Sequence, residues 1–224
     1  MRDDPKNIWT TEYSEKYEAV NYDSGLSGWV MRASHSLIER PYGSEARFNR
    51  VLEVGAGSGV HLKYVRHSFS EYWLTDFSQQ MLDQAIARAN DPRVASSVED
   101  ATRLSFQDSF FDRVIACHVL EHLYQPHLVL REWSRVLKPG GTLSIVLPSD
   151  PGLAWRLGRH LGPRRRAEKN GLAYDYIMAR EHVNPITNLV NFIQYYFDDR
   201  KEYWWPLKAP ICDINLIYAV NIIK

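Results

Sequence analysis

The chain has 224 residues, which is enough for one α/β domain with a sizeable core. Its formal net charge is zero, so no overall electrostatic argument favours nucleic acid or an anionic membrane as a partner. Two cysteines, Cys117 and Cys212, are too few for a disulfide framework. No run approaches the roughly 18 apolar residues that span a bilayer, and the N-terminus lacks the apolar core of a signal peptide. We therefore expect a cytoplasmic protein without a membrane span.

The N-terminal segment, residues 1–45, is predicted to be helical. Aromatic residues punctuate a short helix near 10–20, and apolar positions recur at helical spacing over 26–38. Tyr13 and Tyr17 either pack in the ordinary way or close over a bound ligand. The segment is therefore a candidate lid.

Strands and helices alternate over residues 48–148. The strands are short and apolar, and we expect them at 50–54, 72–75, 94–98, 111–117 and 142–147. Helices are expected between them at 60–67, after the capping residue Ser78, and at 126–137, where Lys138-Pro-Gly-Gly141 ends the last one. This alternation predicts a parallel sheet covered on both faces, whose ligands bind beyond the carboxyl ends of the strands.

The rest of the chain, from residue 150, breaks this rhythm. Residues 150–185 form a basic stretch that we interpret as a helical insertion or cap. A helix at 186–197 follows, and two strands at 201–207 and 214–223 are expected to form a hairpin that closes the sheet edge. All parts belong to a single domain, 1–224.

A glycine-rich loop, Val51-Leu-Glu-Val-Gly-Ala-Gly-Ser-Gly59, follows the first strand. Glycines at this point let the backbone turn sharply and approach a ligand closely. Val60 stands where a dinucleotide fingerprint has its third glycine, and Glu53 would repel a pyrophosphate. The carboxylate would instead attract a cationic amino-acid end, which favours S-adenosylmethionine over NAD at this site.

Two further acids follow the next two strands. Asp76 ends the second strand, where a carboxylate can accept hydrogen bonds from a ribose diol. Asp100 and Ala101 follow the third strand, where a carboxylate can take an adenine amino group and a small residue leaves room for the ring. Together with Glu53, these acids are expected at one edge of the sheet.

The chain resembles the class I S-adenosylmethionine-dependent methyltransferases in five segments: VLEVGAGSG, TDFSQQML, EDATRLSF, FDRVIACHVLEHL and LKPGGTLSIVLP. The LEHL and LKPGG segments are most similar to the small-molecule branch of that class. The resemblance covers residues 48–148. It implies a Rossmann-like, doubly wound sheet of seven strands, mostly parallel with an antiparallel last strand, and here the insertion falls between strands 5 and 6. It also implies S-adenosyl-L-methionine as cofactor and S-adenosyl-L-homocysteine as product.

The resemblance also assigns cofactor contacts to positions of this chain. The methionine end of the cofactor, its ribose, its adenine and its sulfonium would be held by Glu53, Gly55, Ala56, Gly57, Asp76, Phe77, Met81, Asp100, Ala101, Cys117 and His118. Outside the core, the stretch from Tyr22-Asp-Ser-Gly25 to His35 and the ending Asp213-Ile-Asn-Leu216 are similar to methyltransferases encoded with surface-glycan or sugar-modifying genes. We therefore expect a small-molecule acceptor, such as a sugar, a nucleotide-sugar or a surface-glycan precursor, methylated on O or N.

His118 and His122 are the candidate general bases. They would share a helix face if a helix began at once after the fourth strand, with Glu121 pointing elsewhere. The alternative is a structural role, in which each histidine caps a helix or is a hydrogen-bonded packing residue. No metal site is expected, because the sequence shows no third ligand at a fixed spacing.

Arg164 and Arg165 of the basic stretch are candidate substrate ligands, since arginine suits phosphate. The alternative for the stretch is a solvated helix face.

Three other functions were weighed against this one. A nucleic-acid base methyltransferase would place an Asn/Asp-Pro-Pro-aromatic segment after strand four, where this chain has Ala116-Cys-His-Val119. A non-catalytic module that binds S-adenosylmethionine would keep the same loop and acids. An NAD-dependent enzyme is disfavoured by Glu53 and Val60. The oligomeric state is left open.

Overall fold

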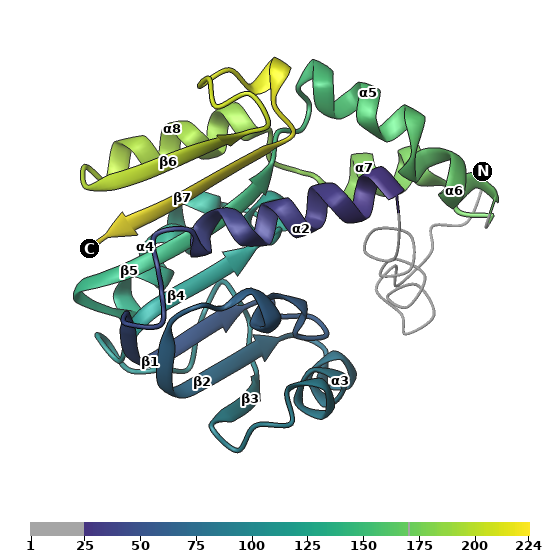
Figure 1. Cartoon of the computed structure of the whole chain (residues 1–224). Coiled ribbons are helices and arrows are strands. Elements are labelled where there is room, and N and C mark those ends of the chain that lie inside the picture. The colour runs from purple at the N-terminus through teal and green to yellow at the C-terminus, as the bar shows by residue number, and fades with distance from the viewer. Residues whose placement is uncertain (1–24, 170) are drawn as a thin grey trace.

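The computed structural model describes residues 25–169 and 171–224, without the side chain of Leu26. A seven-stranded sheet with the order β3-β2-β1-β4-β5-β7-β6 forms its centre (Figure 1). The parallel strands are β1 (Arg47–Val54), β2 (Ser68–Asp76), β3 (Val94–Val98), β4 (Phe111–Cys117) and β5 (Leu137–Pro148). β7 (Ile217–Ile223) runs antiparallel to both of its neighbours, β5 and β6 (Arg200–Trp205). The predicted sheet with its antiparallel last strand is confirmed.

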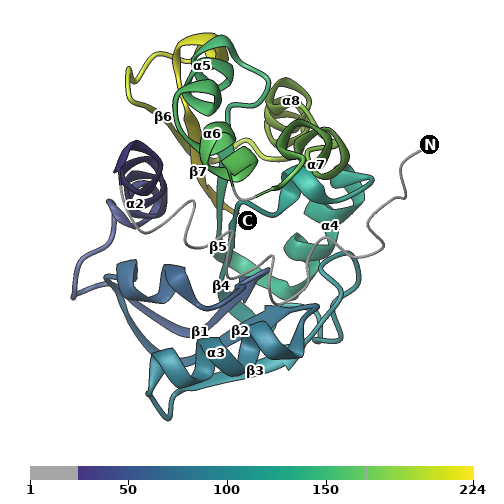
Figure 2. The same cartoon turned by 90° about the vertical axis from the view of Figure 1, so that its right-hand side faces the viewer.

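Helices cover both faces of this sheet. α2 (Gly25–Glu39) and α3 (Gln79–Ala89) pack on one face, and α4 (Pro126–Val136) and α8 (Ile186–Tyr196) pack on the other (Figure 2). Each face has its own apolar cluster: Leu37 and Leu82 belong to the first, and Trp133 and Ile193 to the second. Because both faces are buried, the inner strands are nearly continuously apolar, which is why the sequence pattern identified them.

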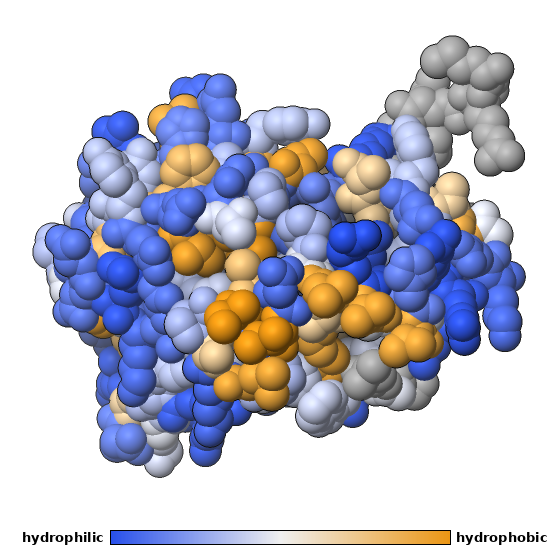
Figure 3. Space-filling model, turned by 90° about the horizontal axis from the view of Figure 1, so that it is seen from above, coloured by the Kyte–Doolittle hydropathy of each residue, from blue (hydrophilic) through white to orange (hydrophobic). Residues whose placement is uncertain are grey.

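The predicted helical insertion lies between β5 and α8. It consists of α5 (Leu153–Leu161), α6 (Pro163–Lys169) and α7 (Tyr174–Glu181). Viewed from above, apolar side chains gather on an exposed surface at this end of the molecule (Figure 3), where Leu153, Leu157 and Leu161 of α5 are exposed. Within the described ranges, no helix is long and apolar enough to cross a membrane.

Several boundaries differ from the sequence prediction, and at two of them the type of segment changes. The helix expected at 60–67 is a short 3-10 turn, η1 (Val60–Tyr64), because β2 already begins at Ser68 and pairs it with Arg47 of β1. The Lys138-Pro-Gly-Gly141 segment is not a break between α4 and β5 but the first part of β5. It carries a register irregularity opposite β4, and a Cβ on Gly141 would come within 3.0 Å of the Asp112 carbonyl oxygen. The predicted helix at 10–20 lies outside the described residues.

Candidate functional site

A cavity of about 570 Å³ lies at the carboxyl ends of β1 to β4. Its volume is typical of small-molecule sites, which span roughly 300–1,000 Å³. Every residue for which a cofactor contact was predicted lines it: Glu53, Gly55, Ala56, Gly57, Asp76, Phe77, Met81, Asp100, Ala101, Cys117 and His118. The fold therefore brings these positions together from four strand ends, as the sequence predicted.

The glycine loop forms the wall of the cavity with its backbone. Gly55 has a φ of +65°, and a Cβ there would lie 2.5 Å from Cγ2 of Val119. A Cβ on Gly57 would point toward Met81, whose Cε would be 3.7 Å away. The loop thus needs glycine at Gly55 for both conformation and space, and a ligand can approach the main chain closely.

Asp76 connects the loop to the next strand. Its Oδ2 accepts a hydrogen bond from the Gly57 amide at 2.9 Å, and its Oδ1 accepts one from the Ser78 amide at 3.0 Å. Burial raises the pKa of the carboxyl. Each carboxylate oxygen can accept a second hydrogen bond, so this side chain can still receive a diol.

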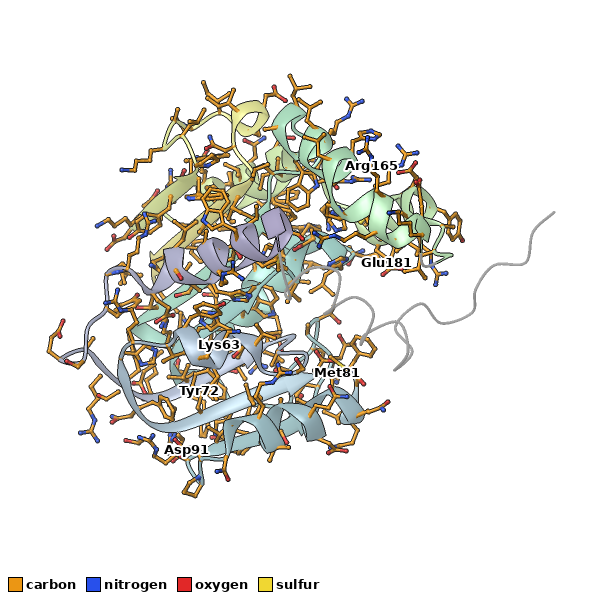
Figure 4. All side chains as sticks on the ribbon, turned by 45° about the vertical axis from the view of Figure 1, so that its right-hand side comes forward. Lys63, Tyr72, Met81, Asp91, Arg165 and Glu181 are labelled. Atoms are coloured by element: carbon orange, nitrogen blue, oxygen red, sulfur yellow. The ribbon has the colours of Figure 1, made fainter. Side chains whose placement is uncertain are left out.

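Glu53 and Asp100 stand in different surroundings. Glu53 is buried, and Tyr72, labelled on β2 in Figure 4, donates its hydroxyl to Oε2 of Glu53 at 2.7 Å. Burial raises the pKa of Glu53. Asp100 is exposed and accepts hydrogen bonds from the hydroxyl and amide of Thr102, which lower its pKa. Glu53 therefore closes the inner end of the cavity, and Asp100 lies at its open side.

Glu99, His35 and His61 also line the cavity, although no contact with a cofactor was predicted for them. Glu99 connects the end of β3 to the following loop. Its Oε1 accepts a hydrogen bond from Ser105 Oγ, and its Oε2 accepts one from the Ser105 amide at 2.9 Å. His35 lies on α2, and its Nδ1 is 3.1 Å from Nδ1 of His61. The position of Glu99 beside Asp100 was its only sequence signal, and His35 required the packing of α2.

A buried ion pair lies behind these histidines. Arg113 on β4 donates to Oε1 of Glu39 on α2 at 2.7 Å, and both side chains are fully buried. The Nε2 of His61 lies 3.3 Å from the same oxygen. Burial by itself would raise the pKa of Glu39, but hydrogen bonding to His61 and the charge of Arg113 lower it to about 2. This network fixes α2 against the sheet beside the cavity.

His118 follows β4 with a φ of +59°, a strained value for a residue other than glycine. Ser34 donates its hydroxyl to the Met31 carbonyl, so the His118 ring donates from Nε2 to Ser34 Oγ at 3.0 Å. Its lone pair is then on Nδ1, which lies 3.7 Å from Oε1 of Glu121. Burial lowers the pKa of His118 to about 3. The ring is therefore neutral at physiological pH and can accept a hydrogen bond through Nδ1.

The condition that a helix begins directly after His118 is not met. A single 3-10 turn, η2 (Leu120–His122), follows instead, and α4 begins at Pro126. The expectation that Glu121 points elsewhere is also wrong, because its Oε1 lies between the two histidines, 3.9 Å from Nε2 of His122. Burial lowers the pKa of His122 to about 3, and its Nδ1 donates to the Glu181 carbonyl at 2.9 Å.

The candidate substrate residues lie elsewhere. Arg164 is engaged in ion pairs with Glu168 and Asp175 on the insertion. Arg165 is exposed, and Figure 4 shows it on the insertion, away from Met81. The structure brings neither arginine to the cavity lining. Tyr13 and Tyr17 lie outside the described residues.

Part of this chain is similar in sequence to known proteins. Residues 52–145 match the family model described as a methyltransferase domain. The chain is 38% identical over 103 residues to a demethylmenaquinone methyltransferase of Clavibacter sepedonicus, covering 46% of this chain and 42% of that protein. It is 35% identical over 105 residues to a phosphatidylethanolamine N-methyltransferase of Cereibacter sphaeroides, covering 45% of this chain and 51% of that protein. The chain thus spans about half the length of these curated relatives.

A solved structure extends the likeness over nearly the whole chain. Phosphoethanolamine N-methyltransferase 2 of Haemonchus contortus, in complex with S-adenosyl-L-methionine, superposes with a TM-score of 0.67 and 17% sequence identity. The superposition covers 98% of this chain and 58% of that one. At this identity, the likeness concerns the fold. The matched segment thus shows a methyltransferase domain over residues 52–145, and the chain has the fold of this solved structure.

Proposed function

We propose that this protein transfers a methyl group from S-adenosylmethionine to a small-molecule acceptor. The observation that carries the proposal is the convergence of Glu53, Asp76 and Asp100 on one cavity around a glycine loop. The residues present fit the cofactor: Glu53 suits its cationic amino group, Asp76 its ribose diol, and Asp100 with Ala101 its adenine. Glu53 and Val60 disfavour a dinucleotide in the same place.

Methyl transfer from a sulfonium is an in-line displacement, and the cofactor supplies the leaving group. The chain must therefore align the acceptor with the methyl group and exclude water. His118 lines the cavity next to Cys117 at the end of β4, and its neutral ring can accept a hydrogen bond from an acceptor hydroxyl or amine. In this proposal His118 and His122 orient the acceptor, and both rings are neutral imidazoles at neutral pH.

The chemical class of the acceptor is a separate part of the proposal. The two relatives above are named for menaquinone and phosphatidylethanolamine, and neither name contains a sugar. Quinols and ethanolamine lipids therefore join sugars and nucleotide-sugars as acceptors to be tested, with methylation on O, N or C. The Ala116-Cys-His-Val119 segment still argues against a nucleic-acid base.

Transfer of an isotope-labelled methyl group from S-adenosylmethionine to a panel of these acceptors tests the proposal. We expect label in at least one small molecule and none in DNA or RNA. His118→Ala should lower turnover while the affinity for S-adenosylhomocysteine stays nearly unchanged. Label that reaches nucleic acid alone would contradict the proposal, and an equal loss of turnover and cofactor affinity would make His118 a cofactor residue.

A further inference from the structure

Glu121, His122 and His182 form a compact group at the His118 end of the cavity. Each side chain offers one ligand atom, and these atoms all lie within 4.8 Å of one another. Glu121 and His122 come from η2, whereas His182 directly follows α7 of the insertion. The Glu121–His122 spacing of 3.9 Å exceeds a hydrogen bond but is short enough for two ligands of one cation.

In both histidines, Nδ1 donates a hydrogen bond to an oxygen of the chain. His182 donates from Nδ1 to Oδ2 of Asp150 at 2.8 Å, and His122 donates from Nδ1 to the Glu181 carbonyl at 2.9 Å. Both rings therefore have their lone pair on Nε2 when neutral. Histidines that bind metals almost always donate their other N–H to a carboxylate or carbonyl, which fixes the tautomer and the ring orientation. The group has this arrangement at both imidazoles.

Glu121 supplies a second, independent observation. Its side chain is 3% exposed, and among the described residues Oε2 has no hydrogen-bond partner. A buried carboxylate oxygen without a partner is costly, and buried charges in proteins are normally paired or bound to a metal. Burial raises the pKa of Glu121 to about 8, and a cation bound to Oε1 beside the imidazoles would replace the proton that burial favours on this carboxyl.

We propose that Glu121, His122 and His182 bind a divalent transition-metal cation at the wall of the acceptor end of the cavity. Two imidazoles and one carboxylate favour Zn²⁺ or Mn²⁺ over Mg²⁺ or Ca²⁺, which prefer oxygen ligands alone. His122 lines the cavity, so the cation stands where an acceptor reaches it. At this site His122 would orient the acceptor through the cation that its Nε2 binds.

The role of the cation rests on the proposed methyl transfer. A hydroxylated acceptor, such as an alcohol, phenol or sugar, would bind the cation through its oxygen. Metal binding lowers the pKa of that hydroxyl, so its proton passes to solvent water. The alkoxide then attacks the methyl carbon, an O–C bond forms, the S–C bond breaks, and its electron pair stays on sulfur.

A second group has ligand atoms equally close together, within 4.8 Å of one another: His35, His61 and Cys117. Burial lowers the pKa of His61, but Cys117 and Glu39 oppose this effect and raise it to about 10. A protonated imidazole has no lone pair for a metal. This group therefore serves as the matched control for the proposed site.

The test is calorimetric titration of Zn²⁺ into the purified chain after treatment with a chelator. We expect one bound equivalent, and Asp150→Asn should weaken binding by about 10–100-fold by releasing His182. Glu121→Gln and His182→Ala should weaken it at least as much, whereas Cys117→Ser should not change it. Neither Glu121 nor His182 is among the cavity-lining residues, so unchanged affinity for S-adenosylhomocysteine shows that these variants fold.

Three outcomes would overturn the proposal: no Zn²⁺ binding by the wild type, unchanged binding in His182→Ala, or loss of binding in Cys117→Ser. A Co²⁺-loaded protein whose spectrum shows a thiolate charge-transfer band would likewise assign the metal to Cys117. Failure of the proposed methyl transfer would appear separately, as absence of cofactor binding, and would leave the Zn²⁺ result standing.

Discussion

At the scale of single residues, Asp76 connects the backbone of the glycine loop to the position predicted for the ribose. Asp76→Ala removes a buried acceptor of charge-assisted hydrogen bonds, each of which contributes about 1.5–3 kcal/mol. The affinity for S-adenosylhomocysteine should fall by at least about tenfold in a calorimetric titration. Asp83→Ala, at an exposed carboxylate on α3, is the control and should bind normally. Unchanged affinity in a folded Asp76→Ala protein would contradict the ribose assignment.

His67 gives the protein a pH-dependent stability. Burial lowers the pKa of its imidazole from 6.5 to about 4 in the folded state. The unfolded chain therefore binds more protons below pH 6.5, so stability should fall as the pH drops from about 6.5 to about 4. The loss should be on the order of 3 kcal/mol. Urea unfolding of the wild type and His67→Gln at both pH values checks this, and an equal pH dependence in the two proteins would contradict it.

Whether the sequence predicted a residue of the site depended on how far along the chain that residue lies from its partners. The cofactor positions follow strand ends within recognisable segments, so spacing and resemblance together predicted that they would meet. His182 and Asp150 could not be found in this way. The bond of His122 to Glu181 joins residues 59 positions apart, across an insertion that matches no motif. Their meeting depends on how α7 packs, which one-dimensional spacing does not encode.

At the scale of elements, the turn from β1 into the loop depends on Gly55. Gly55→Ala combines the cost of a positive φ, about 1–2 kcal/mol, with a clash against Val119. Gly140→Ala is the matched control, because its φ is +73° and a Cβ there would meet nothing within 4 Å. Thermal unfolding should show the larger loss for Gly55→Ala, with reduced cofactor affinity as well. Equal losses would mean that the close approach of Val119 has no energetic role.

The attachment of α2 to the sheet rests on the buried pair of Glu39 and Arg113. Glu39→Ala leaves the guanidinium without its carboxylate in the core, which should cost about 3–5 kcal/mol of unfolding free energy. Asp108→Ala removes the partner of Arg135 at the surface, where Asp108 is 77% exposed, and should cost at most about 1 kcal/mol. Denaturant unfolding measures both variants. Similar losses would contradict the role of the buried pair.

Periodicity predicted the type of most elements but not all of their ends. The inner parts of β1, β2 and β5 are apolar and were found, whereas their first parts, 47–49, 68–71 and 137–141, contain polar residues or proline and glycine and were not. Glycine and proline at Lys138-Pro-Gly-Gly141 indicated a break in the sequence. In the structure, pairing of Leu137 and Thr142 with β4 on either side of it and the bond from the Gly140 amide to the Lys224 carbonyl keep this segment in β5. Tertiary hydrogen bonds outweighed the local preference.

At the scale of the whole molecule, the sheet presents one composite edge. The ends of β1 to β4 line the cofactor cavity, and the insertion after β5 reaches the same edge through His182. The cofactor residues lie within 48–148, and the insertion lies outside this range. The sequence therefore predicted the class of the protein from residues 48–148 but did not predict its acceptor. The fold hosts many acceptors, and specificity comes from segments outside the shared core.

We infer that this cavity binds S-adenosylmethionine. Calorimetric titration of the purified chain with S-adenosylmethionine, S-adenosylhomocysteine and NAD tests it most directly. Micromolar binding of both sulfur compounds and no binding of NAD is the predicted result. Binding of NAD, or no binding of either sulfur compound, would contradict the account.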